Sequence, residues 1–360
     1  MSKRKRTIIW LGVALLGLGY LAFRLSGEAT GEAFRKAIRD TDWRWAGAAV
    51  GTYFAGQTML TFRWNILLKV HGITVTLFQA VKLTYLGLFY NNIMPGAIGG
   101  DLLKGWYITQ HSHKTRRIEA VVTVFVDRLV GLVGMMIIGA LAGFTKAGSL
   151  SVPLGNSGKT IQVRMLIWAM LVLLAIMTVL FFSRRIRRGL LLARLLAKLP
   201  FSGFLKKVDG ALRVYRGYPG VIIMALLITA IIQSLGIVAV WFLTKALGMD
   251  SVTFLHCLII LPVVWLISAA IPVPGGLGIM ENLFIPFFAE IVRHKVGMEI
   301  AVGQAAALAL LNRLMLYACS LPGLLVPLLG GHLPKVKDLE RDQADQVERG
   351  FDEPVEDVPI

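Results

Sequence analysis

Long apolar segments separated by short polar connections dominate this chain. A helix needs roughly 20 apolar residues to cross the hydrocarbon core of a bilayer, and six segments meet that length. Two further apolar stretches are interrupted in the middle by proline and glycine, which predicts hairpins that enter the membrane and return. The predicted crossings are 8–25, 43–62, 118–142, 163–182, 220–243 and 300–328, and the interrupted stretches are 76–104 and 253–291.

Both interruptions combine helix-breaking residues with a carboxylate. The first reads NNIMPGAIGGD over 91–101, and the second reads IPVPGGLGIME over 271–281. Unpaired backbone groups cost several kcal/mol each in hydrocarbon, so a broken helix persists only where protein buries it or water reaches it. The exposed half-helix ends favour an anion such as a lipid phosphate. The candidate substrate-binding residues here are Asn91, Asn92, Pro95, Gly96, Gly99, Gly100, Pro274, Gly275, Gly276 and Gly278.

Charged residues at membrane depth extend this candidate site. Charges there are costly and mark either a pathway or an internal ion pair. Asp127 and Arg128 are adjacent, so on a helix they do not face each other and each needs a partner elsewhere. We expect pairs across the two halves between a carboxylate and an arginine, and a purely structural salt bridge is the alternative. The residues concerned are Asp101, Asp127, Arg128, Glu281, Asn312 and Arg313.

The two halves resemble a distant inverted repeat. In each half a Pro–Gly break and a carboxylate precede an apolar helix with a polar–Arg pair, Asp127-Arg128 or Asn312-Arg313. Interrupted segments at corresponding places in two halves are a sequence pointer to a transporter binding site. The pattern predicts an all-α membrane bundle over residues 1–330, with two re-entrant broken-helix hairpins, followed by an acidic tail over 331–360.

Composition and charge agree with a membrane protein. The chain is 56% hydrophobic and only 16% charged, and its net charge of +17 is gathered in particular connections. Basic connections mark the cytoplasmic side, which here predicts both termini in the cytoplasm and a bacterial inner-membrane location. Nucleic-acid binding is excluded because no basic soluble fold is present. The basic segments are 3–6, 63–75, 104–117 and the amphipathic segment 184–216.

Catalytic and metal-binding motifs are weak. The segment 155–160 ends like a phosphate-binding loop, but Pro153 stands where that motif needs glycine. His111 and His113 lack companion ligands, and Cys257 and Cys319 lie in apolar runs. We therefore expect no cofactor, no metal and no enzyme activity.

The interrupted segments, together with Arg63-Trp64 and Asp127-Arg128, resemble the membrane region of lysylphosphatidylglycerol synthases, the multiple peptide resistance factors. This resemblance implies flipping of an aminoacylated phospholipid between leaflets. The soluble aminoacyl-transferase domain of those synthases is not expected here, as in stand-alone relatives. Because some relatives accompany glycosyltransferases, a polyprenyl-linked saccharide is an equal candidate substrate.

The predicted function is translocation of an anionic phospholipid or lipid-linked intermediate. Arg128 and Arg313 would bind phosphate, and Asp101 and Glu281 would bind a cationic headgroup or tune the arginines. Two alternatives stay open. The first is a membrane-embedded lipid transferase that uses Asp101 or Glu281 as a base. The second is a non-catalytic partner of a separately encoded lipid synthase or glycosyltransferase.

Overall fold

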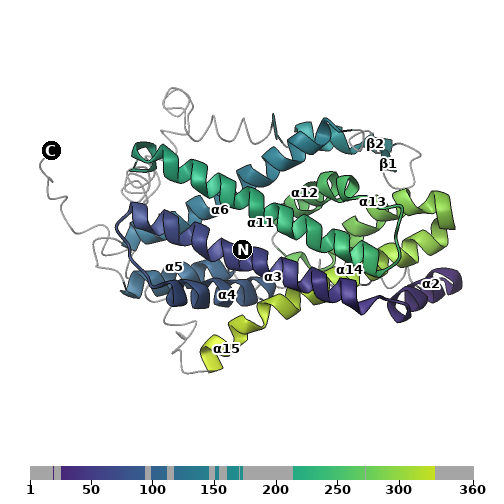
Figure 1. Ribbon diagram of the computed structural model, residues 1–360, viewed down its shortest axis with the longest axis horizontal. Coiled ribbons are helices and arrows are strands. Elements are labelled where there is room, and N and C mark those ends of the chain that lie inside the picture. Colours follow the sequence, from purple (N-terminus) through teal and green to yellow (C-terminus); the bar gives the residue numbers. More distant parts are fainter. Residues whose placement is uncertain are drawn as a thin grey trace, which may run out of the picture.

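The computed structural model describes residues 19, 26–93, 99–111, 117–145, 151–153, 160–169, 171–172, 214–271 and 273–328. These residues form an all-α bundle with one short β-hairpin (Figure 1). The elements are α2 (Glu28–Arg39), α3 (Trp43–Val70), α4 (Leu77–Ile93), α5 (Gly99–His111), α6 (Arg117–Gly143), β1 (Ser151–Pro153), β2 (Thr160–Gln162), η3 (Tyr215–Gly217), α11 (Pro219–Ala246), α12 (Phe254–Ala270), η4 (Pro274–Gly276), α13 (Ile279–Val296), α14 (Met298–Ser320) and α15 (Pro322–Leu328).

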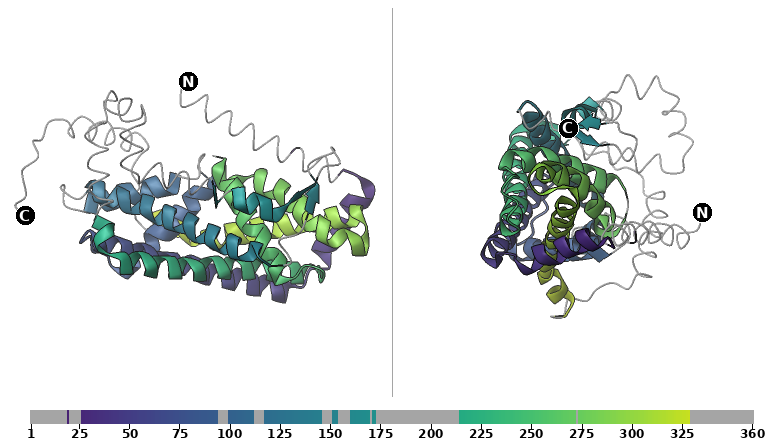
Figure 2. Two further views of the ribbon diagram at one scale, coloured as in Figure 1. Left: turned by 90° about the horizontal axis from the view of Figure 1, so that it is seen from above. Right: turned by 90° about the vertical axis from the view of Figure 1, so that its right-hand side faces the viewer.

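Two long helices run side by side along the molecule. Helices α3 and α11 each contain 28 residues, so each is about 42 Å long and exceeds the roughly 30 Å hydrocarbon core of a bilayer. Their mutual packing is the most extensive in the bundle. Helices α4 and α5 lie toward one end of this pair, and α12 and α13 lie toward the other (Figures 1 and 2).

Among the described residues, three helices are long and apolar enough to cross a membrane. They cover Glu119–Gly143, Pro219–Ala246 and Met298–Val326. The most apolar of them, α11, has only 22% of its apolar window buried. A soluble protein would not expose such a surface, so these helices support a membrane location.

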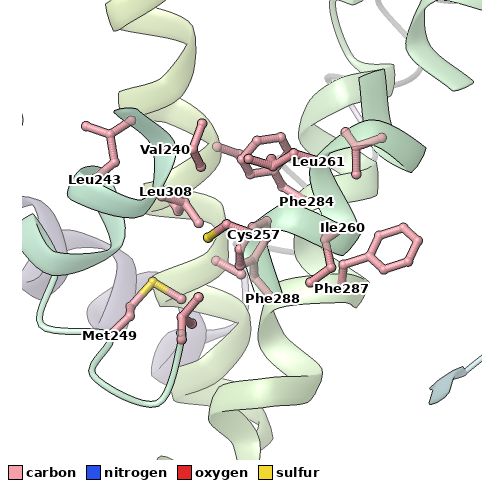
Figure 3. Close-up of a cluster of buried hydrophobic side chains, with 14 of the residues drawn as sticks. Val240, Leu243, Met249, Cys257, Ile260, Leu261, Phe284, Phe287, Phe288 and Leu308 are labelled. Atoms are coloured by element: carbon pink, nitrogen blue, oxygen red, sulfur yellow. The ribbon is translucent and has the colours of Figure 1, made fainter. Parts of the chain in front are cut away.

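The core lies where α11, α12, α13 and α14 meet. Figure 3 shows Phe284, Phe288 and Leu261 gathered against Leu243 and Leu308, all of them buried. The same faces continue as one cluster from the end of α11 to the middle of α14. This cluster fixes the second broken stretch against α14.

The second break is a tight glycine turn between α12 and α13. Gly275, Gly276 and Gly278 have φ angles of 53°, 65° and 78°, a backbone region that only glycine enters readily. The Gly276 N–H donates to the Val273 carbonyl at 3.0 Å, which closes the turn. The break predicted over 271–281 is therefore present in the structure.

The first break separates α4 from α5, which pack against each other as a helical hairpin. The Asn91 side chain spans the break, because its Oδ1 accepts a 2.9 Å hydrogen bond from the Gly100 N–H. Gly100 lies directly on Gly87: a Cβ atom on Gly100 would collide with the Gly87 backbone, and one on Gly87 would displace the Lys104 side chain. Pro95 and Gly96 lie outside the described residues.

Several sequence expectations need correction. The basic segments 63–75 and 104–117 predict Arg63 and Lys104 in cytoplasmic connections, but both residues are buried inside helices, α3 and α5. The crossing predicted over 300–328 agrees with the candidate span Met298–Val326. It consists of two consecutive helices, α14 to Ser320 and α15 from Pro322, because proline cannot donate the next backbone hydrogen bond.

Helix α2 and the hairpin of β1 and β2 were not predicted. Helix α2 packs on α14, and Gly303 of α14 has no room for a side chain beside Thr30 and Ala33. Strands β1 and β2 pair antiparallel, with Val152 opposite Ile161. The crossing predicted over 8–25, most of the one over 163–182, nearly all of 184–216 and the tail from 331 lie outside the described residues.

Replacing Gly100 with alanine should abolish function and destabilise the α4–α5 hairpin. The added Cβ would overlap the Gly87 carbonyl group, and overpacking of a close contact costs typically about 1–3 kcal/mol. Gly105→Ala on the same helix is the control, since its Cβ would lie an ordinary 3.8 Å from Val121 Cγ2. Membrane insertion and thermal unfolding in detergent are measured. Equal behaviour of both variants would show that the close contact is dispensable.

Candidate functional site

The carboxylate of Glu281 binds two elements of the second half. Glu281 is the third residue of α13, where the helix dipole favours a negative charge. One carboxylate oxygen accepts from the Gly278 N–H at 2.7 Å, and the other accepts from Arg313 Nε of α14 at 2.6 Å. Arg313 also donates from one terminal nitrogen to the Gly275 carbonyl at 2.6 Å. The pair is buried, with 6% and 7% of the Arg313 and Glu281 side chains exposed.

The first half contains a matching but more open pair. Asp101 is the third residue of α5, and its carboxylate accepts from Arg128 Nε of α6 at 2.5 Å. The Asp101 side chain is 10% exposed, whereas the Arg128 side chain is 52% exposed. Each of the two ion pairs therefore joins residues of the same half of the chain. The expectation of pairs across the halves is wrong, because in each half the broken hairpin packs beside its own next helix.

Asp127 has a partner that the sequence reading did not identify. Arg63 Nε of α3 donates to Asp127 Oδ1 at 2.8 Å, and a terminal nitrogen of Arg63 donates to Thr229 of α11 at 2.9 Å. All three residues are buried. This cluster joins α3, α6 and α11, so it serves packing of the long helices rather than the cavity. The polar residue Thr229 within an apolar span was the available signal.

The two breaks meet in the middle of the molecule. Element η4 packs against α4, and a Cβ on Gly275 would lie 3.3 Å from the Asn92 side-chain oxygen. A cavity of about 220 Å³ lies at this junction. Its lining comes from both halves and consists of Tyr53, Gln57, Leu88, Asn91, Asn92, Arg128, Trp265, Ser268, Ala269, Gly275, Gly276, Met280, Leu316, Cys319 and Ser320.

Unsatisfied polar atoms surround this cavity. Ser268 is only 6% exposed, and its hydroxyl is buried without a hydrogen-bond partner among the described residues. One terminal nitrogen of Arg313 is in the same situation, beside the cavity-lining Gly275. Buried polar groups are nearly always hydrogen-bonded, so these atoms indicate a place for a polar ligand or water.

Most of the described site residues that the sequence predicted fall into three groups. Asn91, Asn92, Arg128, Gly275 and Gly276 line the cavity. A second group fixes the geometry of the two breaks through hydrogen bonds and consists of Gly100, Asp101, Gly278, Glu281 and Arg313. Asn312 joins this group because it donates to the sulfur of the cavity-lining Met280 at 3.3 Å. Asp127 belongs to the Arg63 cluster. The structure places Gly99 at the start of α5 and Pro274 in η4.

Ten of the fifteen lining residues were not predicted, and four of these ten have a polar or aromatic side chain that faces the junction from α3 or α12. Tyr53 and Gln57 come from α3, and Trp265 and Ser268 come from α12. Gln57 lies within a predicted spanning segment, so its polar side chain was a usable signal. No group of His, Cys, Asp or Glu able to hold a metal occurs among the described residues.

Comparisons with known proteins identify the family. Residues 9–323 match the family described as the lysylphosphatidylglycerol synthase TM region. The chain is also 25% identical over 302 residues to a UPF0104 membrane protein of Pyrococcus horikoshii, which covers 78% of this chain and 85% of that protein. This protein therefore belongs to the lysylphosphatidylglycerol synthase transmembrane-region family, and it is a membrane protein.

Proposed function

We propose that this protein translocates an anionic phospholipid or lipid-linked intermediate between the leaflets of a membrane. The observation that carries the proposal is the cavity at the junction of the two breaks. It combines the half-exposed Arg128 with the Ser268 hydroxyl, which has no hydrogen-bond partner among the residues that the structure describes. A guanidinium fork and hydroxyl donors match the oxygens of a phosphate.

The size of the cavity supports a headgroup rather than a whole lipid as its occupant. Its volume of about 220 Å³ is below the roughly 300–1,000 Å³ of typical small-molecule pockets. The acyl chains would stay in the bilayer beside the apolar outer faces. Ile223, Leu227 and Ile231 form such a face on α11, with 59%, 57% and 46% exposure.

The arrangement of the hairpins supports access from both sides. We interpret the α4–α5 and α12–α13 hairpins as re-entrant segments of an inverted repeat, because they lie toward opposite ends of the bundle (Figure 1). Transporters of this kind bind substrate where broken helices meet near the bilayer midplane. Alternating exposure of the junction would then move the headgroup across.

The ion pairs favour transport over catalysis. Asp101 and Glu281 are each engaged in an ion pair with an arginine, so neither carboxylate can act as a general base without first giving up that pair. The protein is therefore proposed not to be an enzyme. A lipid substrate, and a possible partnership with a lipid synthase or glycosyltransferase, are parts of the same proposal, as are the inner-membrane location and cytoplasmic termini.

Reconstitution into vesicles tests this function. Purified protein should accelerate the transbilayer movement of headgroup-labelled phosphatidylglycerol, measured by the loss of fluorescence when a membrane-impermeant reductant is added outside. Protein-free vesicles and labelled phosphatidylcholine are the controls. Lack of acceleration for phosphatidylglycerol and for a polyprenyl-linked sugar would refute the proposal. A new lipid product formed by purified protein would instead support the transferase.

A further inference from the structure

Any movement of Arg128 onto a substrate phosphate creates a problem for Asp101. The Asp101 carboxylate is buried at 8% residue exposure and accepts from Arg128. Removing one member of a buried ion pair leaves an uncompensated charge, which is strongly unfavourable. Efficient exchange of Arg128 between Asp101 and a substrate therefore needs a second cation near Asp101.

Lys104 lies where that cation is needed. It follows Asp101 by three residues on α5, so the two side chains share one helix face. Lys104 is 5% exposed, and its carbon stem lies against Gly87. Its Nζ rests over the Trp64 ring, 4.9 Å from the centroid.

The charges around Lys104 are not balanced pair by pair. Arg63 pairs with Asp127 and Arg128 pairs with Asp101, and within the described part of the chain Lys104 forms no ion pair with a carboxylate. The contact with Trp64 is a weaker substitute. Lys104 is thus a buried cation on the same helix face as Asp101, whose carboxylate already forms an ion pair with Arg128.

We propose that the Lys104 ammonium forms an ion pair with the Asp101 carboxylate when Arg128 leaves Asp101 to bind the anionic group of the substrate. Lys104 would then be a positioning residue, since it acts through Asp101 and Arg128 rather than on the lipid. Without substrate, Arg128 forms the ion pair with Asp101, and the Lys104 ammonium packs on the Trp64 ring. With substrate bound, Lys104 forms the ion pair with Asp101. This inference rests on the proposed function.

Lys104→Met tests the exchange. Without the replacement cation, Arg128 should stay on Asp101, and the affinity for phosphatidylglycerol, measured by native mass spectrometry or in nanodiscs, should fall roughly tenfold. Lys104→Arg should stay close to wild type. The double variant Asp101→Asn/Lys104→Met should recover binding, because no carboxylate then holds Arg128. Wild-type affinity in Lys104→Met would overturn the proposal.

A matched variant separates the exchange from net charge. Asp127→Asn/Lys104→Met has the same net charge as Asp101→Asn/Lys104→Met but leaves Asp101 in place to hold Arg128. We expect no recovery of binding in this variant. Equal recovery in both double variants would show that Lys104 acts only through its charge and would overturn the exchange.

Trp64 gives a second measurement that needs no Lys104 variant. Loss of the ammonium from the indole face should change Trp64 fluorescence when phosphatidylglycerol binds, seen as the difference between wild type and Trp64→Phe. An unchanged difference spectrum in a protein that binds the lipid would overturn the exchange. Wild-type protein that neither binds nor translocates the lipid would refute the proposed function instead, so the two failures are distinguishable.

Discussion

Replacing Arg313 with leucine is expected to destabilise the protein by about 3–5 kcal/mol, the range measured when one member of a buried ion pair is removed. The Glu281 side chain would remain only 7% exposed without its cation, and the Gly275 carbonyl would lose its donor. Thermal unfolding in detergent measures the effect. Arg39→Leu is the control, because Arg39 is 78% exposed and pairs with an exposed Asp40.

The double variant Glu281→Leu/Arg313→Leu shows whether this pair serves the fold or the substrate. Stability should largely return, since replacing a whole buried pair is far milder than orphaning one charge. Translocation should not return, because the Gly275–Gly278 turn would lose its fixed shape. A double variant that both folds and transports would remove Glu281 and Arg313 from the site.

Replacing Arg128 should have the opposite profile, with a large loss of lipid affinity and a small loss of stability. Its side chain is 52% exposed and lines the cavity, and Lys104 is proposed to pair with Asp101 once Arg128 is gone, so the fold depends on Arg128 less than on Arg313. A hydrogen bond to a charged group contributes about 1.5–3 kcal/mol, which corresponds to a roughly 10- to 100-fold loss of phosphatidylglycerol affinity in Arg128→Leu.

Arg128→Lys refines this prediction. The charge remains but the bidentate fork is lost, so affinity and transport should be intermediate between wild type and Arg128→Leu. Binding is measured with purified protein and transport in vesicles, with unfolding as the common control. Lipid affinity unchanged in Arg128→Leu would show that the cavity does not bind the anionic group through Arg128.

The sequence predicted individual elements better than the contacts between them. Spanning helices at 118–142 and 220–243 agree with α6 and α11, because a long apolar run leaves a helix few alternatives. The breaks were recognised because glycine and proline act locally. Helix α2 was missed because it is short and polar, with a stability that depends on packing against α14.

Partners of buried charges depend on long-range packing, which no local pattern contains. Arg63 looked like a loop charge at the end of a span, yet α3 continues to Val70 and buries it on Asp127. The same reason hid Lys104 in α5. Ser268 and Trp265 of α12 line the cavity because the glycine turn that follows α12 packs against α4.

The contacts of Glu281 and Arg313 make the second half mechanically stiff. Arg313 of α14 binds both ends of the glycine turn: it donates directly to the Gly275 carbonyl, and it pairs with Glu281, which accepts from the Gly278 N–H. We therefore expect the turn and α14 to move together as one rigid unit. In the first half a single half-exposed arginine joins α5 to α6 at the corresponding place. We expect relative motion during transport to occur between α5 and α6 in the first half, while the second half stays rigid.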